Sequence, residues 1–118
     1  MLNQVVLVGR LVRDVDTNTS ESGKKIATIT LAVPRSFKNH DGLYDTDFID
    51  CIMWDAVAMN TSEFCKKGDI VGIKGRIQSK KIVENDINKT YLEVIAEKVT
   101  FLTSKKEQEE IEKESKAS

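Results

Sequence analysis

A strand that is apolar on both faces opens this chain and most constrains what it can fold into. Side chains alternate across a strand, and here both sets are apolar: Val5, Leu7 and Leu11 on one face, Val6, Val8 and Val12 on the other. With 118 residues the chain is one domain in size, so its own core is expected to cover only one face. A second copy is expected to cover the other. Gly9 is expected to mark a bend or bulge that helps to close a small barrel.

Four more strands and one helix are expected after this first strand, which is placed at 3–14. The strands are expected at 24–34, 44–54, 69–79 and 90–102, and the polar segments at 15–23, 38–42 and 80–89 are interpreted as loops. A helix is expected between the third and fourth strands. This order predicts an all-β fold, a five-stranded OB-fold barrel whose strand face commonly binds oligonucleotides.

Punctuating residues set the expected ends of these elements. Pro34 has no N–H and is expected to end the second strand or to lie at a sheet edge. Asp55 is expected to cap the helix, which runs to about Cys65, and Gly68 is expected to be its C-terminal cap.

Composition and motif content exclude several functional classes. No apolar run approaches the roughly 18 residues of a membrane helix. Because residues 1–4 lead directly into the first expected strand, we expect no signal peptide. Cys51, Cys65 and His40 are the only Cys and His residues, too few for a four-ligand zinc site without carboxylates. Both cysteines are expected to be buried free thiols. No catalytic constellation is present, so we expect no enzyme, no metal and no cofactor.

Two aromatic side chains share the outer face of the third strand. Alternation places Phe48 and Trp54 about 20 Å apart on one face, opposite the apolar Ile49, Cys51 and Met53. Unpaired bases stack on exposed aromatic rings, at about 1–3 kcal/mol per base. The alternative is that either ring packs under a loop or a partner subunit. The pair lies near a basic stripe, which favours stacking.

This basic stripe lies on the fourth strand. It consists of alternating side chains on one face, Lys74, Arg76, Gln78 and Lys80, with Lys81 following in the loop. Surface lysines are usually only solubilising, but this spacing on a strand that faces the aromatic strand favours contact with a phosphate backbone. Arg10, Arg35 and Lys38 are expected to extend the nucleic-acid-binding groove that the basic stripe and the aromatic strand would form. The net charge of −1 gives no such indication.

Five motifs together resemble the bacterial single-stranded DNA-binding proteins. They are MLNQVVLVGRL (1–11), ITLAV (29–33), DFIDCIMW (47–54), KKG (66–68) and GRIQS (75–79). The resemblance extends from Met1 to about Leu102. It implies an OB-fold homotetramer that wraps single-stranded DNA without sequence preference. By matched position it implies that Phe37, Phe48 and Trp54 stack on bases and that the first strand forms the dimer contact.

Departures from the family pattern point to a specialised member. Ile82 stands where many members have an aromatic residue, and Asp55 and Ala56 stand where relatives are commonly basic. We interpret 1–104 as the binding domain and 105–118 as a charged, disordered tail with four lysines and five glutamates. This tail lacks the acidic, phenylalanine-ended tip of other members, so it is not expected to recruit replication enzymes.

The sequence therefore predicts a cytoplasmic, nucleoid-associated protein that binds and protects single-stranded DNA during replication, recombination or repair. Two alternatives stay open. An RNA-binding OB module would use the same stacking and phosphate contacts. A primosome-type accessory protein would have given its strand face over to protein contacts.

Overall fold

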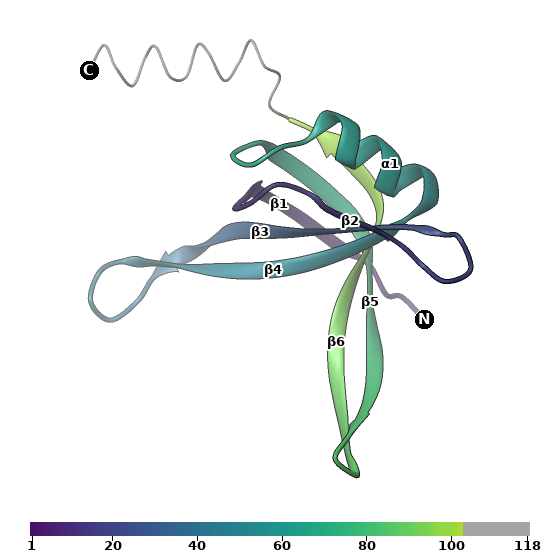
Figure 1. Cartoon of the computed structure of the whole chain (residues 1–118). Coiled ribbons are helices and arrows are strands. Elements are labelled where there is room, and N and C mark those ends of the chain that lie inside the picture. Colours follow the sequence, from purple (N-terminus) through teal and green to yellow (C-terminus); the bar gives the residue numbers. More distant parts are fainter. Residues whose placement is uncertain (103–118) are drawn as a thin grey trace.

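Six strands and one helix make up the part of the chain that the computed structural model describes, residues 1–102. The elements are β1 Val5–Leu11, β2 Asp16–Thr19, β3 Lys25–Lys38, β4 Tyr44–Trp54, α1 Asp55–Phe64, β5 Ile70–Glu84 and β6 Ile87–Phe101. The β3–β4 and β5–β6 hairpins project from the barrel in different directions (Figure 1). The predicted tail at 105–118 lies outside the described residues.

Strand pairing closes the sheet into a barrel. The strand order is β1-β5-β6-β4-β3-β2, and β1 also pairs with β3. The β4–β6 pair is parallel and the other pairs are antiparallel. Five long strands thus surround the core, with α1 between the third and the fourth of them. The predicted all-β, five-stranded OB-fold is confirmed.

Gly9 allows the barrel to close. β1 pairs with β5 from Val5 to Arg10 and reaches β3 only at Arg10 and Leu11. A Cβ atom at position 9 would lie 2.8 Å from the carbonyl oxygen of Ala32, a backbone atom that cannot move aside cheaply. A glycine is therefore needed where β1 crosses β3. The bulge expected at Gly9 is not present, because the β1–β5 register runs through it without a shift.

The core uses one face of each strand. Its largest fully buried side chains are Leu11, Ile29, Leu31, Met53, Ile73 and Val71, and α1 adds Ala58 and Thr61. Burial also separates the two apolar faces of β1. Leu11 is buried and Leu7 packs against the core, whereas Val6 and Val8 are 70% and 53% exposed.

Two segments interpreted as loops contain strand. Residues 16–19 form β2, which pairs with β3 from Thr28 to Lys25. Residues 80–89 belong to the β5–β6 hairpin, whose ladder runs to the Glu84–Ile87 pair. Its two-residue turn places Asn85 and Asp86 at φ 50° and 63°. Asparagine and aspartate tolerate this left-handed conformation better than most residues.

The expected end of β3 and both expected helix caps were wrong. β3 continues through Pro34, which pairs with Thr46, but Pro34 lies at a sheet edge, the other position expected for it, because β3 pairs only with β4 there. Trp54 is the N-cap of α1, with extended backbone and no side-chain cap hydrogen bond, whereas Asp55 is the first helical residue. Cys65 caps the C-terminus by donating its N–H to the Thr61 carbonyl. Gly68, at φ 94°, belongs to the turn that follows.

Both cysteines are buried free thiols, as predicted. Burial raises the pKa of Cys51 to about 12 and that of Cys65 to about 11, so both stay protonated at neutral pH. Within residues 1–102, no three His, Cys, Asp or Glu side chains are grouped to hold a metal ion. No helix in this part of the chain is long and apolar enough to cross a membrane.

Candidate nucleic-acid interface

The side of β4 that faces away from the core carries the predicted aromatic pair. Cys51 and Met53 point inward and are buried, as alternation predicted. Phe48 points outward and is 68% exposed, and Trp54 is half-buried on the same side. We call this side, continued across β6 and β5, the outer face.

β6 separates the aromatic strand from the basic strand. The sequence interpretation had β5 facing β4, but the two strands are not adjacent in the sheet. Ile52 on β4 pairs with Ile95 on β6, which pairs with Arg76 on β5. Two strand spacings separate Ile52 from Arg76, or about 10 Å. The aromatic and basic residues therefore share one face, with the outward side chains of β6 between them.

The basic stripe on β5 keeps its predicted alternation. Lys74 is exposed and lies beside Val6 of β1, and no ion pair holds it within residues 1–102. Arg76 is half-buried and donates from Nη1 to Oε1 of Gln78 at 2.6 Å. Lys80 lies beside Tyr91 on the outer face, while alternation points Lys81 to the opposite side of the hairpin.

Arg10 joins the outer face from β1. It pairs with Ala32 of β3, which in turn pairs with Phe48, so the three residues form a row across the sheet. The small alanine leaves room between the cation and the ring. One guanidinium nitrogen of Arg10, Nη1, donates to the Gly68 carbonyl at 3.1 Å and fixes the side chain.

The far end of the β3–β4 hairpin holds the remaining predicted residues. Phe37 is 64% exposed. The ammonium group of Lys38 lies 5.8 Å from the ring centroid of Tyr44, a cation–π arrangement. Both groups are therefore available at the surface.

Arg35, near the same end, is held by carboxylates instead. Its Nη2 and Nε donate to the two oxygens of Asp47 at 2.9 and 3.1 Å, and Asp45 lies 3.6 Å away. The hydrogen bond raises the pKa of Arg35 and lowers that of Asp47. Asp47 alternates to the side opposite Phe48, so the structure does not bring Arg35 to the outer face.

The sequence interpretation missed three residues of this surface. Tyr44 and Tyr91 are 57% and 46% exposed on the outer side of β4 and β6. Tyr91 could have been placed on this side from the sequence, because it alternates along the strand with Glu93 and Ile95. Arg13, which follows β1, donates from Nη2 to the Thr30 hydroxyl at 2.6 Å. Its partners are distant in sequence, so no local pattern could reveal it.

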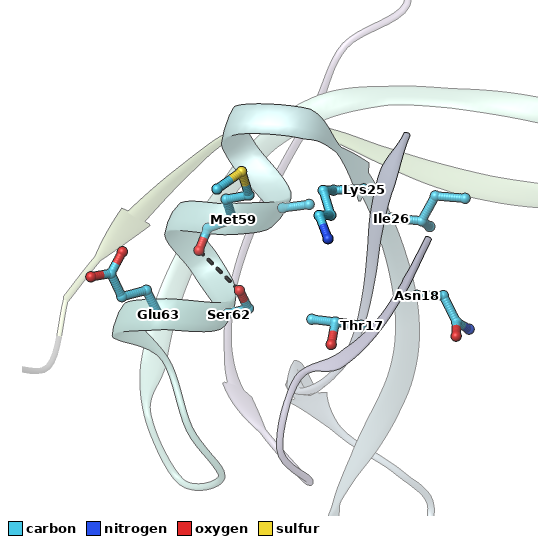
Figure 2. A pocket seen from close by; sticks show the side chains of 8 residues that line it. Thr17, Asn18, Lys25, Ile26, Met59, Ser62 and Glu63 are labelled. Atoms are coloured by element: carbon cyan, nitrogen blue, oxygen red, sulfur yellow. Dashed lines mark hydrogen bonds between the residues drawn. The ribbon is translucent and has the colours of Figure 1, made fainter. Parts of the chain in front are cut away.

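A cavity of about 330 Å³ lies away from the outer face, between α1 and the β2–β3 hairpin. Thr17 and Lys25 point toward the helix, whereas Asn18 and Ile26 point away from it (Figure 2). Ser62 donates its hydroxyl to the Met59 carbonyl at 2.9 Å instead of pointing a free group into the space. None of the predicted interface residues lines it.

A closed five-stranded barrel with an aromatic and basic outer face defines an OB-fold protein, a class whose strand face commonly binds oligonucleotides. The model of the single-strand binding protein family matches residues 2–102. The chain belongs to this family.

Relatives from several bacteria resemble the chain over most of its length. It is 45% identical over 106 residues to single-stranded DNA-binding protein 3 of Listeria innocua, covering 89% of this chain and 66% of that protein. It is 43% identical over 106 residues to single-stranded DNA-binding protein B of Bacillus subtilis, covering 89% of this chain and 94% of that protein. This chain thus spans just under two thirds of the first protein and nearly all of the second.

A solved structure shares the fold. The deletion mutant of the single-stranded DNA-binding protein from Thermus aquaticus superposes with a TM-score of 0.75 at 23% identity. The match covers 88% of this chain and 52% of that one. At this identity the likeness supports the OB-fold alone.

Proposed function

We propose that this chain binds single-stranded DNA without sequence preference and protects it during replication, recombination or repair. The single observation that carries the proposal is the outer face itself. Exposed Phe48 lies in register with Arg10, and the β5 cations lie on the same face. Rings that stack on any base and cations that contact any phosphate do not depend on sequence. Membership of the single-strand binding protein family supports this assignment.

The contacts divide into stacking and phosphate groups. We assign stacking to Phe37, Phe48 and Trp54. Phosphate contacts are assigned to Arg10, Arg35, Lys38, Lys74, Arg76, Lys80 and Lys81. Lys74 and Arg76 lie on the outer face and have no carboxylate partner within residues 1–102, unlike Arg35 and Lys80. Arg35 would first have to leave Asp47.

A homotetramer is the proposed assembly, formed in the cytoplasm and associated with the nucleoid. β1 pairs on one edge with β5, whereas its other edge meets β3 only at Arg10 and Leu11. The open edge of Val5–Val8, together with exposed Val6 and Val8, suits antiparallel pairing with β1 of a second copy. One such contact makes a dimer, and the tetramer needs a second, separate contact.

Titration with oligo-dT at several salt concentrations tests the function. Trp54 is the only tryptophan, so stacking is expected to quench its fluorescence, and affinity is expected to fall as salt rises. Absence of binding at low salt would favour an accessory protein that contacts other proteins. Tighter binding to a matched RNA oligonucleotide would favour an RNA-binding module.

A further inference from the structure

Two cations of the outer face are already held by carboxylates of the same face. Arg13 Nη2 lies 3.7 Å from Asp50 Oδ1, and the Thr30 hydroxyl donates to the same oxygen at 2.5 Å. Lys80 Nζ lies 3.6 Å from Glu93 Oε1. A phosphate that binds either cation must therefore share it with a carboxylate or displace that carboxylate.

The two carboxylates lie where a bound strand has to pass. Asp50 and Glu93 line opposite walls of a cleft of about 280 Å³ between β4 and β6, with Ile52, Leu92 and Val94. This cleft separates the aromatic residues of β4 from the cations of β5. A polynucleotide that stacks on Phe48 and reaches Arg76 crosses it, and its phosphates meet both negative charges.

We propose that Asp50 and Glu93 limit the affinity for single-stranded DNA by competing with phosphate for Arg13 and Lys80. Binding then proceeds by exchange of ion-pair partners. This proposal rests on the proposed function, and it adds two residues that weaken DNA binding. Both pairs are suited to exchange. Arg13 and Asp50 have side chains 66% and 70% exposed, so water and salt weaken their attraction. In the second pair the Lys80 side chain is 58% exposed, so its ammonium group is accessible to phosphate.

Substitutions that replace each carboxylate with an uncharged amide test the competition directly. Asp50→Asn and Glu93→Gln are each expected to tighten oligo-dT binding by about three- to tenfold at low salt, because each frees a cation. Each freed cation that binds a phosphate also steepens the slope of log K against log salt by about 0.7. Glu63→Gln on α1 is the matched control, since it changes the net charge equally but lines the cavity away from the outer face. Its affinity is expected to change less than twofold.

Repeating each substitution in a variant that lacks the partner cation separates partner exchange from a general charge effect. In Arg13→Ala the gain from Asp50→Asn should disappear, and in Lys80→Ala the gain from Glu93→Gln should disappear. An amide oxygen at position 50 still accepts the Thr30 hydrogen bond, and thermal unfolding verifies that the fold is retained. Gains that match Glu63→Gln, or that persist without Arg13 and Lys80, would overturn the exchange. Failure of the wild-type chain to bind at all would overturn the proposed function as well.

Discussion

Two ends of the same outer surface expose apolar side chains, yet they suit different partners. At β1 the exposed residues are the aliphatic Val6 and Val8, beside a strand edge that β3 leaves open. At β4 they are aromatic, Phe48 and Trp54, with cations nearby, and this strand also has an open edge over 44–50, because β6 pairs only with Cys51 and Ile52. An open edge with flat aliphatic packing suits another strand. Rings beside cations suit bases and phosphates.

The comparison teaches that exposure alone does not define a binding site. Both strands have an open edge, so the side chains distinguish the two surfaces: aliphatic residues at β1, and aromatic rings with neighbouring cations at β4. Each can be altered separately, because Val8 and Phe48 lie on different strands. The following substitutions are ordered from the largest expected effect to the smallest.

Charge on the outer face of β1 should break the tetramer. Val8→Asp is expected to give a folded species of no more than dimer mass by light scattering, because the carboxylate has no partner in the apolar β1 contact, whereas the second contact is left unchanged. Leu11→Ala, on the opposite face, should instead lower the free energy of unfolding by about 2–5 kcal/mol. A wild-type mass equal to one chain would contradict the assembly. So would a tetramer that persists in Val8→Asp.

Loss of a ring on β4 should weaken DNA binding while assembly stays intact. Trp54→Ala and Phe48→Ala are each expected to reduce the binding free energy by about 1–3 kcal/mol per contacted base. Ile82→Ala is the control on the β5–β6 hairpin and should change it much less. Tight binding with unchanged tryptophan fluorescence would show that Trp54 does not stack on DNA.

Alternation predicted the two surfaces of this comparison but not how they are joined. Phe48 and Trp54 were assigned to the correct side because inward Cys51 and Met53 are apolar at every second position. These positions depend on neighbours along one strand, and period-2 patterns report them well. Gly9 was recognisable only as a missing side chain in an apolar strand, because the Ala32 carbonyl that requires a glycine there belongs to another strand.

Features that depend on distant pairing could not be predicted. β6 lies between β4 and β5 because of a parallel pairing between segments about 40 residues apart, which no local pattern encodes. The far end of the β5–β6 hairpin, residues 80–89, was interpreted as a loop because it is rich in polar residues, and it projects from the barrel (Figure 1). Its turn residues, Asn85 and Asp86, include no glycine to indicate a hairpin.

Neutralising the β5 cations should weaken binding to all sequences alike. Lys74→Ala or Arg76→Ala is expected to flatten the slope of log K against log salt by about 0.7 for each phosphate that the variant no longer binds. Because Asp55 and Ala56 replace residues that are commonly basic in the family, the wild-type slope should itself be shallow. Arg35→Ala should have a smaller effect, since Asp47 holds that guanidinium. A steep slope that neither β5 substitution changes would place the phosphate path elsewhere.

Removal of residues 105–118 should have the smallest effect on either surface. This segment carries four lysines and five glutamates, and Ile111 is its only large apolar residue. Its nearly balanced charge should neither compete for Lys74 and Arg76 nor dock into a basic pocket of another enzyme. Deletion is expected to leave the solution mass of the assembly and its oligo-dT affinity nearly unchanged. A change in affinity of several-fold, or capture of replication or repair enzymes by this segment in pull-downs, would show that it acts on the outer face or recruits partners.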